Sequence, residues 1–166
     1  FKKKYFCHGI GYDIHRFDNN TNNGLKLCGI KIPFKRLIGH SDADVGIHAI
    51  CDSIFGALSM NDIGYYFKND DEKWKNANSK IFLLYCKKIL IEKKLYVVNL
   101  DINFICEKPN INKYSLKMKK NIANLLSIPD NIIAIKATTN EKLGFIGNEQ
   151  GIAAESIIQI SNEKFY

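Results

Sequence analysis

Arginine is scarce in this sequence: Arg16 and Arg36 are the only two, against 22 lysines and a net charge of +7. The lysines are spread along all 166 residues and form no single basic segment. Proteins that bind nucleic acid usually gather lysine and arginine on one face and add arginine forks or aromatic platforms that read the bases. We therefore expect no nucleic-acid partner.

Long hydrophobic runs are also absent, since no apolar stretch approaches the roughly 18 residues of a membrane-spanning helix. Three prolines, 46% hydrophobic residues and 25% charged residues are typical of a soluble globular protein. A chain of this length is of ordinary size for one folding unit, and no repeat or linker-like segment divides it. We expect a single domain over residues 1–166 that does not enter a membrane.

The cysteines form no Cys-x-x-Cys pair, and their number is odd. They are widely spaced in apolar surroundings, at Cys7, Cys28, Cys51, Cys86 and Cys106. This pattern argues against a disulfide framework and against a zinc knuckle. It predicts reduced, mostly buried thiols.

Apolar patterning predicts the element order β-β-α-α-β-α-β. The expected strands cover residues 5–14, 25–32, 95–107, 132–138 and 151–160. Ser41 or Asp42 is expected to cap a first helix that ends near Leu58. Further helices are expected at 79–94 and 113–126, with a polar surface loop at 69–78 before the first of them.

Two features of the N-terminal third shape the expected fold. Gly9 and Gly11 interrupt the first strand, where glycine permits a bulge or the close approach of another backbone. The polar segment 19–24 predicts a turn that joins the first two strands as a hairpin. The three helices can cover only part of a small mixed sheet, so we expect an α+β domain, a two-layer sandwich.

Asp13 and His15 end the predicted first strand, and His48 lies on the following helix. Side chains two residues apart on an extended chain share a face, so these two can converge on one ion that His48 completes. Such a His2Asp set leaves a tetrahedral position open, as in catalytic zinc sites, with manganese or iron as competitors. The alternative is that Asp13 and His15 only form a turn and that His48 faces solvent.

Asp44 and Asp52 lie one helical turn before and after His48. Either carboxylate could act as an outer partner of the ligand histidine. Asp52 in particular can accept a hydrogen bond from the imidazole and so orient it. An ordinary, partly exposed helical acid is the alternative for Asp52.

Two further segments favour phosphate binding. The run from His40 to Asp44 precedes a helix N-terminus, where free amides and the helix dipole favour anions, although simple capping would also use it. The run from Lys136 to Gly147 is rich in threonine and glycine, whose hydroxyls and turn amides can bind phosphate oxygens. Glu141 within it offers a hard oxygen ligand suited to magnesium, although many such loops only turn.

Five blocks of the sequence together resemble one family, in its order and across nearly the full chain. They are Gly9-Ile-Gly-Tyr-Asp-Ile-His-Arg-Phe17, Gly39-His-Ser-Asp-Ala-Asp-Val-Gly-Ile-His48, Asp62-Ile-Gly64 with Phe67, Glu107-Lys-Pro109, and Lys136-Ala-Thr-Thr-Asn-Glu-Lys-Leu-Gly-Phe145. The chain resembles the 2-C-methyl-D-erythritol 2,4-cyclodiphosphate synthases of the non-mevalonate isoprenoid pathway. The combination of Asp-x-His with His-Ser-Asp-x-Asp-x-x-x-His is highly specific.

The resemblance implies a phosphorus–oxygen lyase that assembles as a homotrimer with three active sites between neighbouring subunits. The implied reaction converts 4-CDP-2-C-methyl-D-erythritol 2-phosphate into the 2,4-cyclodiphosphate and CMP, as the 2-phosphate attacks the β-phosphate. An intramolecular phosphoryl transfer asks the protein mainly to fold the substrate into line and to neutralise charge. A zinc-dependent phosphohydrolase and a metal-stabilised binding module are the alternatives.

The resemblance also implies roles for single residues. Zn²⁺ would be held by Asp13, His15 and His48, and a Mg²⁺ or Mn²⁺ that bridges the substrate diphosphate by Glu141. His40 and Thr139 match positions that stabilise the transition state. The implied substrate contacts are Asp13, His15, His40, Ser41, Asp62, Ile63, Gly64, Phe67, Asp71, Cys106, Pro109, Thr138, Thr139, Glu141 and Phe145.

The chain departs from the family pattern at several of these blocks. Lys68 and Asn69 stand where Pro-Asp usually follows the phenylalanine, and Asn110 replaces a frequent lysine of the cytidine segment. Asn148 and Gln150 replace an arginine and a glutamate. Because that arginine can face a cavity on the trimer axis that holds isoprenoid diphosphates, we expect such ligands to bind this chain more weakly.

The family occurs in bacteria and in plastids. The lysine-, asparagine- and isoleucine-rich composition and a first residue other than methionine favour a plastid protein with an upstream targeting segment, in the stroma of an apicoplast. The bacterial alternative is the cytoplasm.

Overall fold

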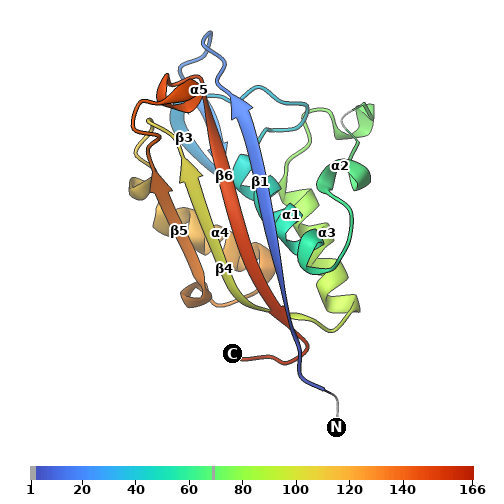
Figure 1. Cartoon of the computed structure of the whole chain (residues 1–166). Helices are drawn as coiled ribbons and strands as arrows, with labels where there is room; N and C mark the ends of the chain where they lie inside the picture. The colour runs from blue at the N-terminus through green and yellow to red at the C-terminus, as the bar shows by residue number, and fades with distance from the viewer. Residues whose placement is uncertain (1–2, 69) are drawn as a thin grey trace.

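A four-stranded mixed sheet forms one layer of the structure, a computed structural model that describes residues 3–68 and 70–166 (Figure 1). Its strands lie in the order β1-β6-β4-β5, with β1 paired antiparallel to β6, β6 antiparallel to β4, and β4 parallel to β5. Their bounds are β1 (Phe6–Arg16), β4 (Tyr96–Ile105), β5 (Ile133–Thr138) and β6 (Gly151–Ser161).

Helices cover one face of this sheet and form the second layer, which confirms the predicted two-layer α+β fold (Figure 1). The long helices are α1 (Val45–Ala57), α3 (Lys80–Glu92) and α4 (Ser115–Leu126). Short elements complete the chain at α2 (Ile63–Tyr66), η1 (Glu72–Trp74), η2 (Ile111–Lys113), η3 (Asp130–Ile132) and α5 (Gly144–Gly147). Within the described ranges, no helix has both the length and the apolar character needed to cross a bilayer.

The segment predicted as one strand at 25–32 is instead a separate hairpin of β2 (Gly24–Leu27) and β3 (Ile30–Lys35). The chain reverses at Cys28 and Gly29, whose φ angles of 48° and 77° are left-handed. The predicted hairpin between the first two strands is also wrong, because β1 pairs along its whole length with β6. A cysteine before glycine is a weak turn signal, so patterning alone missed this reversal.

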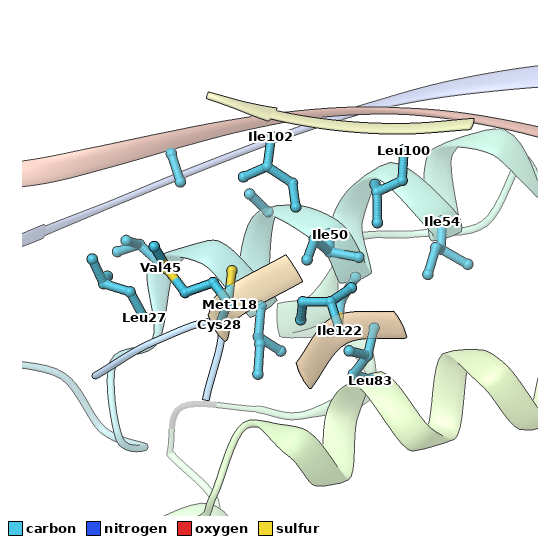
Figure 2. Packing of buried hydrophobic residues seen from close by; sticks show 14 of the residues in the cluster. Leu27, Cys28, Val45, Ile50, Ile54, Leu83, Leu100, Ile102, Met118 and Ile122 are labelled. Carbon is cyan, nitrogen blue, oxygen red and sulfur yellow. The ribbon is translucent and has the colours of Figure 1, made fainter. Parts of the chain in front are cut away.

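The core lies between the sheet and the helices, with α1 at its centre (Figure 2). Ile50 and Ile54 of α1 lie among Leu100 and Ile102 of β4 and Leu83 of α3, and all five are fully buried. The cysteines are free and, apart from the partly buried Cys7, buried, as predicted. Because α1 is enclosed on both sides, its position relative to the sheet is fixed by packing.

The backbones of β1 and α1 touch directly at the two glycines of the first strand. A Cβ atom at Gly9 would lie 1.8 Å from the carbonyl oxygen of Ser53, and one at Gly11 would lie 1.9 Å from that of Ala49. No side chain fits in that space, which confirms the predicted close approach of another backbone. The contact brings His48 of α1 against the end of β1.

The first helix is capped by Asp44 and not by Ser41 or Asp42. The Asp44 carboxylate accepts hydrogen bonds from the N–H of Ile47 at 3.1 Å, of Cys28 at 2.8 Å and of Gly29 at 2.6 Å. Burial raises the pKa of Asp44 to about 6 despite these N–H donors, so it is a carboxylate at neutral pH. The cap therefore also anchors the turn of the β2–β3 hairpin to α1.

Candidate metal and phosphate site

Asp13, His15 and His48, the metal triad below, come together where β1 meets α1. One ligand atom from each lies within 4.8 Å of the other two. The Asp13 Oδ2 atom is 2.8 Å from His48 Nδ1 and 3.2 Å from His15 Nε2. The structure thus brings together the three residues that sequence spacing placed on one strand end and one helix.

The orientation of His15 follows from a hydrogen bond to the main chain. Its Nδ1 lies 2.7 Å from the carbonyl oxygen of Ile38. A carbonyl can only accept, so Nδ1 carries a proton, and Nε2, which faces Asp13, is the nitrogen that can bind a metal ion. His15 is therefore held as a ligand through Nε2.

His48 is held from its other side by serine hydroxyls. Its Nε2 lies 2.9 Å from Ser79 Oγ and 3.3 Å from Ser41 Oγ, and its Nδ1 faces Asp13. Two imidazole nitrogens and a carboxylate oxygen thus converge on one point. This donor set of two imidazoles and one carboxylate is of the kind that holds a catalytic zinc ion, and the cavity lies beside it.

Burial and hydrogen bonding shift the charges within the triad in opposite directions. Burial alone would raise the pKa of Asp13, but hydrogen bonds from His15 and His48 outweigh it and lower the pKa to about 2. Burial alone would lower the pKa of His15, but the hydrogen bond and charge of Asp13 raise it. In the metal-free protein, a proton between the Asp13 carboxylate and an imidazole supplies positive charge at this site.

The structure corrects the expected support of His48 by Asp44 and Asp52. The Asp44 side chain binds the backbone of the hairpin turn and of α1. The Asp52 carboxylate accepts a 2.7 Å hydrogen bond from the N–H of Ile63 and so fixes the start of α2. Among the described residues the imidazole partners are Asp13, Ser41 and Ser79. Ser79 is 31 residues from His48, so helical spacing gave no signal for it.

The metal triad opens on a cavity of about 320 Å³. The predicted residues in its lining, besides the triad, are His40, Ser41, Asp52, Asp62, Ile63, Gly64 and Phe67. Sequence reasoning missed three aromatic lining residues, Tyr12, Trp74 and Phe82. Trp74, the only tryptophan, stands alone in a polar segment, and that contrast was the available signal.

One wall of this cavity is an aromatic cluster. Phe67 is buried, with its ring centroid 4.4 Å from that of Phe82 and 5.0 Å from that of Trp74. The segment predicted as a plain surface loop contains the η1 turn that places Trp74 here; Asn69 lies outside the described residues. Asp71 contributes its main chain, since its carbonyl oxygen lies 3.1 Å from His40 Nε2.

A second group of predicted site residues lies at the ends of β4 and β5. It comprises Cys106, Pro109, Thr138, Thr139 and Glu141. The N–H of Cys106 donates to the Thr138 carbonyl at 3.1 Å, and Thr139 Oγ1 lies 3.4 Å from Glu141 Oε1. Burial and the neighbouring Glu107 charge raise the pKa of the Cys106 thiol to about 12, so it is not a nucleophile.

The two groups belong to opposite edges of the sheet. β1 is one edge strand and β5 the other, with β6 and β4 between them. Three strand spacings amount to roughly 14 Å. Phe145 of α5 lines a separate cavity of about 640 Å³ with His15, Phe17 and Gln150. One chain therefore presents two separate groups of predicted site residues, of which only the first contains the metal triad.

The fold and the site together define a two-layer α+β protein with an open His2Asp site beside a polar cavity. Comparison with known proteins places it more closely. The chain belongs to the YgbB family, whose pattern it matches over residues 6–161.

Similar proteins cover nearly the whole chain. A curated 2-C-methyl-D-erythritol 2,4-cyclodiphosphate synthase from Ehrlichia canis is 49% identical over 161 residues, which are 94% of this chain and 93% of that protein. The solved structure of the bifunctional IspDF from Campylobacter jejuni matches with a TM-score of 0.90 and 36% identity over 96% of this chain. This chain spans 43% of that longer protein.

A structure of IspF from Plasmodium falciparum in complex with CDP matches with a TM-score of 0.82 and 37% identity. The match covers 93% of this chain and 95% of that one. The curated relatives from Ehrlichia canis and Ehrlichia ruminantium are bacterial, so they give no support to the predicted plastid location.

Proposed function

We propose that this chain converts 4-CDP-2-C-methyl-D-erythritol 2-phosphate into 2-C-methyl-D-erythritol 2,4-cyclodiphosphate and CMP. The observation that carries the proposal is the convergence of the metal triad beside the cavity of His40, Ser41 and Asp62. Membership of the YgbB family and 49% identity to a synthase of that name support the same reaction. The geometry and the family thus agree on one activity.

The reaction is an exchange at phosphorus within one molecule. An oxygen of the 2-phosphate forms a bond to the β-phosphorus, and the bond from that phosphorus to the bridging oxygen breaks, so that CMP leaves with the electron pair. The substrate supplies its own nucleophile, so the protein has to bring the two phosphates into line and neutralise their charge. No side chain has to attack.

The metal triad would hold Zn²⁺, which supplies Lewis-acid stabilisation of the β-phosphate when bound. The protein's part is orientation: Ile38 fixes the tautomer of His15, and Ser79 fixes the ring of His48. Zinc is the proposed ion because two histidines and one carboxylate form an open site of the catalytic kind. Manganese and iron use similar donors and are the competitors.

The cavity side chains would bind the substrate. His40 is anchored through Nε2 to the Asp71 carbonyl, so its other ring nitrogen faces away from that anchor, toward the phosphates. Ser41 can donate to a phosphate oxygen. Asp62 and the backbone at Gly64 can accept and donate hydrogen bonds to the hydroxyls of the methylerythritol.

The second group of predicted site residues, contributed by a neighbouring subunit, would bind the CMP portion of the substrate. Thr138, Thr139 and the backbone from Cys106 to Pro109 would hold the cytidine, and Glu141 a Mg²⁺ or Mn²⁺ on the diphosphate. The opposite sheet edges favour this division, because a homotrimer can set the β5 edge of one subunit beside the β1 edge of the next. The uncovered sheet face carries Ile10 and Ile157, which are 70% and 54% exposed, as expected of an interface.

We further propose a bacterial-type cytoplasmic enzyme, because curated relatives such as the two Ehrlichia synthases are bacterial. The reaction itself is tested by ³¹P NMR of the products from the CDP-linked substrate with zinc and magnesium present. The proposal predicts CMP and a cyclic diphosphate in equal amounts. Methylerythritol phosphates without ring closure would instead identify a zinc-dependent phosphohydrolase.

A further inference from the structure

Behind His48, on the side away from Asp13, lies a chain of polar contacts formed by Lys26, Asp42 and Ser79, called the serine relay below. Ser79 Oγ contacts both His48 Nε2, at 2.9 Å, and Asp42 Oδ1. The Ser79 N–H donates to Asp42 Oδ2 at 3.2 Å, and Lys26 Nζ lies 2.5 Å from the same oxygen. The relay joins β2, the segment before α1 and the start of α3.

The relay fixes the direction of its hydrogen bonds. Asp42 forms an ion pair with Lys26 and accepts hydrogen bonds from the N–H and the hydroxyl of Ser79, so its carboxylate is the acceptor in each contact. The single hydroxyl proton of Ser79 must therefore go to Asp42. Ser79 Oγ is left as an acceptor, and its remaining partner is the Nε2–H of His48.

The tautomer of His48 follows from these hydrogen-bond directions. With the proton on Nε2, Nδ1 is the nitrogen left to bind a metal ion at the centre of the metal triad, 2.8 Å from Asp13 Oδ2. The opposite tautomer would place Nδ1–H in the metal position and leave Ser79 without a donor.

Burial makes the relay a fixed part of the site. Ser79 is fully buried, and the side chains of Lys26 and Asp42 are each 17% exposed. A hydrogen bond screened from water in this way holds its geometry better than an exposed one. The other hydroxyl near Nε2 is that of Ser41, but at 3.3 Å its contact is longer, and Ser41 also lines the substrate cavity.

We propose that Lys26, Asp42 and Ser79 are positioning residues that hold the His48 proton on Nε2 and so prepare Nδ1 to bind the metal ion. Lys26 acts indirectly, because its ion pair holds the Asp42 carboxylate in place. The inference rests on the proposed metal site and adds the residues that set its affinity. Outer hydrogen-bond partners of ligand histidines typically contribute about 10- to 100-fold in metal affinity.

The test measures zinc affinity by competition with a chromophoric chelator, together with the rate at which the His48 Nε2–H proton of the zinc-loaded protein exchanges with solvent. Ser79→Ala removes the acceptor, and Ser79→Thr keeps a hydroxyl in the same place. Lys26→Met removes the charge, and Lys31→Met is its matched control, because Lys31 is the exposed cross-strand partner of Lys26. Circular dichroism of each variant checks that it is folded.

We expect Ser79→Ala to weaken zinc binding about 10- to 100-fold and to speed solvent exchange of the Nε2–H proton, which loses its acceptor. Lys26→Met should weaken zinc binding roughly fivefold, which is the contribution expected of a partly buried ion pair. Ser79→Thr and Lys31→Met should stay close to wild type. Wild-type zinc affinity and wild-type exchange of the Nε2–H proton in folded Ser79→Ala would overturn the relay, whereas a wild-type chain that binds no zinc would refute the metal site itself.

Discussion

At the scale of single residues, the chemistry centres on one carboxylate between two imidazoles. In the metal-free protein, hydrogen bonds from His15 and His48 outweigh burial and hold the pKa of Asp13 at about 2, below its ordinary 3.8. Asp13 in turn raises the pKa of His15 above its ordinary 6.5, against the effect of burial. The two shifts act on stability in different pH ranges.

The sign of each effect gives a pH prediction for the metal-free protein. The lowered pKa of Asp13 contributes stability above about pH 4 that is lost as pH falls toward 2. The raised pKa of His15 contributes stability below about pH 6.5 that is lost as pH rises through the raised value. The stability advantage of wild type over Asp13→Asn should therefore peak near pH 5. Urea unfolding across pH 2–8 measures it, and an advantage independent of pH would contradict the pairing.

The metal ions give a second prediction at this scale. Chelation should abolish turnover, and zinc alone should restore less activity than zinc with magnesium, because the metal triad and Glu141 would hold different ions. Rates of CMP release after stepwise metal addition provide the measurement. Full recovery with zinc in magnesium-free buffer would argue against the role of Glu141.

At the scale of elements, the site depends on how closely α1 approaches β1. The direct backbone contact at Gly9 and Gly11 sets the distance between His48 and the strand that carries Asp13 and His15. Any side chain there must push the helix away from the strand. The ligand geometry and the packing of the core are thus coupled through two glycines.

Gly11→Ala is predicted to destabilise the fold by about 1–3 kcal/mol, as overpacking does, and to weaken zinc binding in the same variant. Gly56→Ala is the matched control on α1. A Cβ at Gly56 meets nothing closer than 3.5 Å, so this substitution should stabilise the helix by about 0.5–1 kcal/mol and leave zinc affinity unchanged. Denaturant titration and zinc competition measure both effects. Gly11→Ala with wild-type zinc affinity would show that the contact does not set the ligand distance.

The elements also show what a sequence can predict about this molecule. The Asp-x-His spacing placed two ligands on one strand face because side chains alternate along any strand. The β2–β3 reversal at Cys28 and the cap at Asp44 were missed, because both depend on a contact between the hairpin turn and the start of α1. Ser79 was missed for the same reason, since it reaches His48 only after α3 packs against α1.

At the scale of the whole molecule, the predicted site residues fall into two groups, one where β1 meets α1 and one at the ends of β4 and β5. The metal triad belongs to the β1 edge, and Thr139 with Glu141 follows the β5 edge. An apolar sheet face that includes Ile10 and Ile157 lies uncovered between them. A homotrimer would cover this face and complete each site at once.

The trimer axis gives a further prediction. Asn148 and Gln150 stand where the family pattern has an arginine and a glutamate, so the axis would lack a cation that can bind diphosphate. Calorimetric titration with geranyl diphosphate should therefore give weak or undetectable binding, and Asn148→Arg should strengthen it. Tight binding of geranyl diphosphate by the wild-type chain would contradict the prediction that Asn148 weakens diphosphate binding at the axis.

The central claim is that the metal triad of one subunit works with Glu141 of the next, and one complementation measurement tests it. His48→Ala and Glu141→Ala chains, each expected to be inactive alone, are co-expressed with different tags, and mixed trimers are isolated and assayed for CMP release. Each mixed trimer should have about a third of wild-type activity, because only one of its three subunit boundaries joins an undamaged His48 to an undamaged Glu141. Mixed trimers that stay inactive would place both halves of the site in a single chain and contradict the account.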